Sequence, residues 1–232
     1  MLIGQTKWIR LGVFALPVAG LLLTVSLLVL SVTSGIAWSP DVDPRGTTAA
    51  VSSRGWSVGW FVFSAGLLMV VFGSIALAAT LANRRGGPGA VVAMVVSILA
   101  IALLLPFFGI LAYALPPTGQ AYLAGSSDAL DLGDASFKAA LGVAVAGDVL
   151  YWAGCIVFGV AIWRSGALPR WAAVLFAIHG LLIHGPLALT VIAGVPVFAL
   201  LGGVLLAGAG WGIAGSLWRR PPEVAAGRLQ RE

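Results

Sequence analysis

The sequence predicts an all-α fold: one transmembrane domain over residues 1–232, built as a polytopic six-helix bundle with both termini in the cytoplasm. Hydrophobic residues make up 60% of the chain, charged residues only 9%, and the mean hydropathy is +1.04. Soluble domains average about 45–50% apolar and about 25% charged residues. This composition excludes soluble, disordered and coiled-coil proteins. The spacing of the apolar segments and the placement of the basic residues supply the rest of the prediction.

Six apolar segments have the length of a membrane span, which takes roughly 20 residues. The first begins with basic residues like a signal peptide, but its apolar run exceeds the roughly 7–15 residues of a signal core, so we expect a retained span. The stretch from Trp171 to Trp218 contains no charged residue and is too long for one crossing, so we divide it at a turn predicted around Ala193 to Pro196. The predicted spans cover residues 9–38, 56–81, 90–115, 137–163, 171–193 and 197–218.

Basic residues set the predicted orientation. The positive-inside rule places the Lys/Arg-rich side in the cytoplasm and so predicts an inner-membrane protein with cytoplasmic termini. Because these residues flank apolar spans, the sequence pI of about 10.1 does not indicate nucleic-acid binding. Arg164, Arg170 and Trp171 are the expected anchors at the inner interface. The ten basic residues of that side are Lys7, Arg10, Arg84, Arg85, Arg164, Arg170, Arg219, Arg220, Arg228 and Arg231, against Arg45, Arg54 and Lys138 on the other.

The two longer loops fall on the predicted outer side, at residues 39–55 and 116–136. The first resembles the start of a calcium-binding loop at Asp41 and Asp43, but Arg45 and Ser52 stand where oxygen ligands belong, so we reject that interpretation. In the second we expect a solvated loop; the alternative is that a short interfacial helix begun by Ser126-Ser127 presents its acidic residues to recruit cations at the outer surface. Its acidic residues are Asp128, Asp131 and Asp134.

Ionisable groups inside a membrane are costly and are candidates for function. Asp148 lies ten residues inward from Lys138, which places it about 15 Å deep and near the middle of the bilayer. If spans four and five form an antiparallel hairpin, His184 reaches a similar depth and can pair with Asp148. His179 is rotated from it by about 140° on an ideal helix and lies on another face. The candidate intramembrane polar site comprises Asp148, His184, His179, Tyr151 and Cys155.

Three interpretations of this polar site stay open: hydrogen bonding between helices, a site for protons or a solute, and ligation of a metal or haem. The single cysteine excludes a zinc site built from several thiolates, and too few ligands remain for us to assign a metal. We assign no cofactor. The chain has no nucleotide-binding, zinc-protease or serine-hydrolase motif, so we assign no catalytic residue and lean against an enzyme.

Glycine is abundant, at 31 residues, and concentrates in the last predicted span. Small residues four apart allow helix backbones to approach closely in lipid. Either this packing holds the bundle together or it forms an interface with a second copy or a larger complex. The helix-packing candidates are Gly203, Gly208 and Gly212.

One connection resembles a known group of proteins. Trp163-Arg164-Ser165 leads into Leu168-Pro169-Arg170-Trp171, which is similar to a cytoplasmic loop in uncharacterised bacterial six-span membrane proteins. Gly147-Asp148 and the glycine-rich last span are also similar, so the likeness covers roughly the second half of the chain. The resemblance implies a small six-span bacterial protein. It implies no activity and gives His179 and His184 no role.

The leading functional expectation is a small inner-membrane protein that handles a solute or protons through a cavity near Asp148 and His184. The alternative is an accessory or structural subunit that packs against a larger membrane protein complex. The lipid bilayer is the one partner that composition itself predicts.

Overall fold

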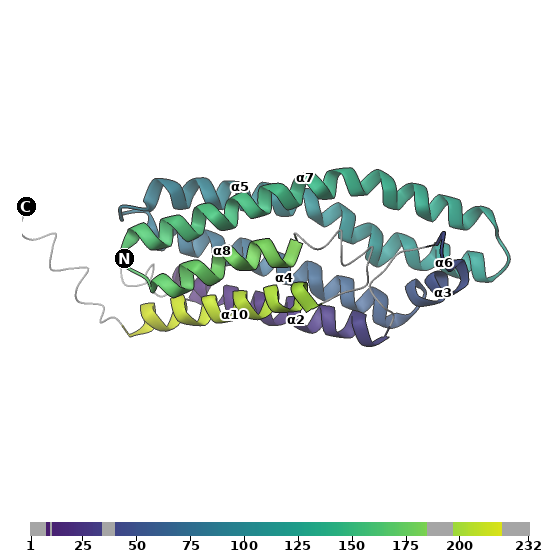
Figure 1. Ribbon diagram of the computed structural model, residues 1–232, viewed down its shortest axis with the longest axis horizontal. Helices are drawn as coiled ribbons and strands as arrows, with labels where there is room; N and C mark the ends of the chain where they lie inside the picture. Colours follow the sequence, from purple (N-terminus) through teal and green to yellow (C-terminus); the bar gives the residue numbers. More distant parts are fainter. Residues whose placement is uncertain (1–7, 10, 34–39, 185–196, 220–232) are drawn as a thin grey trace, which may run out of the picture.

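All regular elements among the described residues are helices. The structure is a computed structural model that describes residues 8–9, 11–33, 40–184 and 197–219. Six longer helices run along one axis of an elongated bundle (Figure 1). They are α2 (Ala15–Thr33), α4 (Arg54–Leu81), α5 (Gly87–Gly109), α7 (Asp128–Ser165), α8 (Arg170–His184) and α10 (Val197–Trp218). Three short elements complete the described chain: α3 (Pro44–Val51), the π-helix η1 (Ile110–Ala114) and α6 (Leu115–Leu123).

Five helical segments within the described ranges are long and apolar enough to cross a bilayer, which indicates a membrane protein. They cover residues 11–33, 54–81, 87–123, 128–165 and 197–218. Helix α8 is described over 15 residues, so the predicted span 171–193 extends beyond the part that the structure describes. The predicted turn around Ala193 and the outer end of the first predicted span, with Trp38, also lie outside it.

The six longer helices form a closed ring. Each packs against the next in the chain, and α10 returns to pack against α2. In Figure 1, α5 and α7 lie along one edge, α2 and α10 along the other, with α4 and α8 between them. Every helix of the ring exposes large apolar side chains, which would be unfavourable in water over so wide a surface. Examples are Leu21, Val25, Phe61, Leu68, Val92, Val95, Val149, Ile156, Val174, Leu181, Leu201 and Val204.

Close approach of the helices depends on small residues. A Cβ added at Gly203 would lie 3.2 Å from the Gly20 carbonyl oxygen of α2, and one added at Gly212 would overlap the Trp171 ring of α8. A Cβ added at Gly208 would contact only the Leu175 side chain, at 3.6 Å, which is an ordinary van der Waals distance. The glycine-rich α10 therefore contacts this chain's own helices on two sides.

The predicted outer loops are largely helical, so the expectation of a solvated loop at residues 116–136 is wrong. Helix α7 begins at Asp128, where Asp128 and Asp131 occupy its first turn and favour the positive end of the helix dipole. Asp134 forms an ion pair with Lys138 one turn later, which also stabilises the helix. The fourth predicted span is therefore the inner part of a 38-residue helix.

The first outer loop also contains a helix, α3. The Asp43 carboxylate accepts a hydrogen bond from the Gly46 backbone N–H at 2.9 Å and so caps the helix N-terminus. The acidic pattern that resembles a calcium loop is thus used as a helix cap.

The third predicted span does not end at residue 115, because the helix continues through η1 and α6 to Leu123. In η1 the Leu115 N–H bonds to the Ile110 carbonyl, five residues back. The Leu111 carbonyl would next meet Pro116, which has no N–H. The Trp56 indole N–H of α4 donates to it instead, at 2.6 Å. A buried side chain thus satisfies the backbone group that the irregular helix leaves without a helical partner.

The two ends of the bundle carry different charges. The described basic residues Arg84, Arg85, Arg164, Arg170 and Arg219 lie where α4 joins α5, where α7 joins α8, and where α10 ends. This is also the end at which α2 begins, shown on the left in Figure 1. The opposite end, with α3 and α6, carries the acidic residues Asp41, Asp43, Asp128, Asp131 and Asp134 together with Arg45, Arg54 and Lys138.

Candidate functional site

A buried polar cluster joins α7, α8 and α10. His179 on α8 is fully buried, with Nδ1 2.9 Å from the Gly202 carbonyl oxygen of α10 and Nε2 2.9 Å from the Tyr151 hydroxyl of α7. A carbonyl can only accept, so Nδ1–H is the donor to Gly202. In the neutral ring, Nε2 then accepts the hydrogen bond from the Tyr151 O–H. The backbone of α10 thereby selects the histidine tautomer.

Cys155 extends this cluster by one turn of α7. Its side chain and that of Tyr151 are both buried on the same face of the helix. On the facing helix, a Cβ added at Gly180 would lie 2.8 Å from the Cys155 sulfur, so this glycine allows α8 to approach. Tyr151 and His179 therefore form a chain of hydrogen bonds that ends on the Gly202 carbonyl of α10, with Cys155 buried one turn away on α7.

Aromatic rings close the side of the cluster that faces the basic end. Phe176, one turn before His179 on α8, contacts it edge-on at a centroid distance of 6.2 Å. Phe158 of α7 meets Phe176 edge-on at 5.7 Å, and both phenylalanines are buried. The cluster is therefore separated from the basic end by an apolar layer.

Asp148 lies on α7 one turn from Tyr151, on the side away from the phenylalanines. Residues three apart on a helix share a face, so Asp148, Tyr151 and Cys155 form one polar stripe along α7. Asp148 is half-buried, and its Oδ1 is shielded from solvent. The neighbouring Gly147 packs against α5, where an added Cβ would lie 2.8 Å from Leu104.

The structure brings together three of the five predicted site residues: His179, Tyr151 and Cys155, with Asp148 one turn away. The backbone of His184 belongs to the last turn of α8, but its side chain lies outside the described part, so the Asp148–His184 pair stays a prediction. The pairing of Tyr151 with His179 was missed. Depth along the helices does not reveal this pair, because it depends on how α7 and α8 are rotated about their axes. Among the described residues, no three His, Cys, Asp or Glu side chains gather as metal ligands do.

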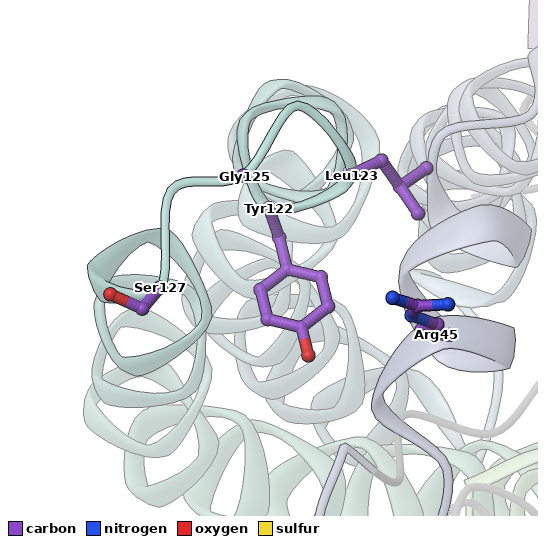
Figure 2. Close-up of a pocket in the computed structure, with 5 residues that line it drawn as sticks. All are labelled: Arg45, Tyr122, Leu123, Gly125 and Ser127. Carbon is purple, nitrogen blue, oxygen red and sulfur yellow. The ribbon is translucent and has the colours of Figure 1, made fainter.

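A polar pocket of about 480 Å³, which sequence reasoning also missed, lies at the acidic end. Figure 2 shows Arg45 of α3 and Tyr122 of α6 reaching into the space between these helices, with Ser127 beyond Tyr122. The Ser127 hydroxyl hydrogen-bonds to the Asp128 carboxylate at 3.0 Å. The pocket lining does not include Asp148.

A second hollow of about 260 Å³ lies between α7 and α8 at the basic end. Gly166, with φ of +59°, ends α7 in the left-handed conformation, which glycine adopts readily, and Arg170 begins α8. The Arg170 guanidinium stacks over the Trp163 ring at 5.3 Å. The hollow is lined by Ile156, Gly159, Val160, Trp163, Arg164, Ala173, Val174 and Ala177.

Comparisons with known protein families, with curated proteins and with solved structures find no match to this chain. The resemblance of the Trp163–Trp171 connection to bacterial six-span proteins therefore stays a prediction.

Proposed function

We propose that the chain is an inner-membrane protein that crosses the bilayer six times with both termini in the cytoplasm. The six longer helices alternate in direction around a closed ring, and their basic end collects the arginines that the positive-inside rule places in the cytoplasm. The fifth crossing is the predicted span 171–193, of which the structure describes the α8 part. The outer side then carries α3, α6 and the acidic start of α7.

In this membrane placement, the protein transfers protons, or a solute whose movement is coupled to protons, at the polar stripe of α7 formed by Asp148, Tyr151 and Cys155. The observation that carries this proposal is the carboxylate of Asp148 one turn from the buried Tyr151–His179 pair. Carboxylates and histidines inside the membrane form proton relays, and histidine titrates near neutral pH.

The Tyr151–His179 hydrogen bond supports one route for such a relay, with Asp148, one turn away on α7, as the proposed proton donor. A proton donated by the Asp148 carboxyl to the Tyr151 oxygen allows the hydroxyl proton to pass to Nε2 of His179. Asp148 is then ionised, Tyr151 is again neutral, and His179 carries the positive charge, so the proton count is unchanged. Because Nε2–H now donates to Tyr151, the hydroxyl must turn away, which couples the charge of His179 to the orientation of Tyr151.

Asp148→Asn tests the proposal, because an amide keeps the shape of the side chain but cannot exchange a proton in this way. In liposomes with an internal pH dye, we expect the wild type to pass protons under an imposed potential and the variant to fall to the level of protein-free liposomes. Asp131→Asn, at an exposed site on the same helix, is the matched control and should keep the wild-type flux.

Melting curves separate this loss from misfolding. We expect Asp148→Asn to melt within about 4 °C of the wild type, a shift equivalent to roughly 1 kcal/mol in a chain of this size. Wild-type flux no higher than that of protein-free liposomes, or an unchanged flux in Asp148→Asn, would show that the proposal is wrong.

The rival function is that of an accessory subunit in a larger membrane complex. It is favoured by the fully satisfied His179 ring, which suits a packing role, and by the absence of Asp148 from both pocket linings. Native mass spectrometry after gentle extraction tests it: other subunits bound to the chain would support the rival, and a monomer or homo-oligomer would oppose it.

A further inference from the structure

The hollow between α7 and α8 is an open groove with a floor of small residues. A Cβ added at Gly159 would lie 3.0 Å from both the Ala173 carbonyl oxygen and the Ala177 Cβ, so the two helices approach closely here. Val160 and Val174 rise on either side and are 48% and 43% exposed. The groove is therefore apolar along its length and opens to the outside of the bundle.

Positive charge marks one end of this groove. Arg164 lines it, and Arg170 lies over the Trp163 ring beside it. Neither arginine forms an ion pair within the described residues. The described carboxylates lie at the opposite end of the bundle, apart from Asp148 inside it. The two arginine side chains are thus available to bind an anion at one end of the apolar groove.

We propose that this groove holds one anionic phospholipid, with an acyl chain on Gly159, Ala173 and Ala177 and its phosphate at Arg164 and Arg170. The inference rests on the membrane placement proposed above, which puts both arginines at the headgroup level of the cytoplasmic leaflet. Arginine forks match phosphate oxygens bidentately, and the apolar groove suits a hydrocarbon chain. A lipid is the occupant because the groove faces the bilayer and combines these two chemistries along one line.

Native mass spectrometry in detergent, with added phosphatidylglycerol or phosphatidylcholine of identical chains, tests the proposal. We expect the wild type to bind its first phosphatidylglycerol more tightly than phosphatidylcholine. Arg164→Gln should weaken phosphatidylglycerol binding about fivefold, as expected for one cation near an anionic headgroup. Arg84→Gln removes a charge from the same end but outside the groove lining, and should leave binding unchanged.

A second pair of variants tests the position of the acyl chain. Val160→Trp places a large ring over the groove and should weaken binding of both lipids. Val95→Trp is its control, because Val95 is 46% exposed on α5, away from the groove. Arg170→Gln repeats the charge test if Arg164→Gln does not fold.

Equal loss in Arg84→Gln and Arg164→Gln would overturn the proposal in favour of diffuse electrostatic attraction. Equal affinity for the two lipids in the wild type, or no effect of Val160→Trp, would also overturn it. These results are independent of proton flux and of the sidedness of the arginines, so failure of the lipid site is distinguishable from failure of the proposed function.

Discussion

Gly20→Val is expected to break the α2–α10 interface. A Cβ added at Gly20 would lie 2.6 Å from the Gly203 carbonyl oxygen and 2.8 Å from the Ala207 Cα. Both atoms belong to the backbone of α10, so no rotamer change relieves the clash and the helices must separate. Overpacking costs typically about 1–3 kcal/mol. We expect the upper end of that range or more, because α10 closes the ring on α2 at this contact.

Thermal unfolding in detergent measures this effect. At about 2–4 °C per kcal/mol for a chain of this length, the melting temperature should fall by roughly 10 °C. Gly142→Val is the matched control, because nothing lies within 4 Å of a Cβ added at this exposed position on α7. If both variants melt alike, α2 and α10 are not packed as described.

Tyr151→Phe has the second large effect that we expect. It removes the O–H that donates to Nε2 of His179, while the ring itself keeps its packing. A buried acceptor left without its donor costs about 1–3 kcal/mol, although hydrogen bonds in membranes average nearer the low end. The variant should therefore melt at least about 2 °C below the wild type.

Tyr113→Phe makes the same chemical change at a side chain that is 65% exposed and should leave the melting temperature unchanged. Proton flux adds a readout that a purely structural role would not produce. If Tyr151 carries the relay, flux is lost at temperatures well below the melting point of the variant. A folded Tyr151→Phe protein with wild-type flux would remove Tyr151 from the relay.

The helical class and the position of most long helices could be predicted from hydropathy, because the apolar runs dominate the sequence. The ends of the helices at the acidic end of the bundle could not be predicted in this way. Hydropathy treats Asp128–Lys138 as polar and therefore as loop, whereas the ion pair of Asp134 and the placement of two aspartates in the first turn favour helix. The π-helix was also missed, since its stability depends on the Trp56 indole, a contact distant in the sequence.

The sequence predicts which residues belong to the candidate site, but not which of their side chains contact one another. Depth along a helix follows from residue counting, so Asp148 and His179 could be placed inside the bundle. Which side chains meet depends on the rotation of each helix about its axis. That rotation is set by contacts such as Gly180 against Cys155 and Gly202 against Ile183, which no periodicity in one helix reveals.

The side of the membrane on which Arg219 lies tests the six-crossing architecture most directly. That side depends on whether α8 crosses the membrane. Single cysteines replace Arg84, Asp131 or Arg219, and intact cells are treated with a membrane-impermeant maleimide. The native Cys155 is buried, and the unmodified protein gives the background. We expect Asp131→Cys to react in intact cells, and Arg84→Cys and Arg219→Cys to react only after the cells are opened. If Arg219→Cys reacts in intact cells while Arg84→Cys does not, α8 turns back within the membrane and the chain crosses five times.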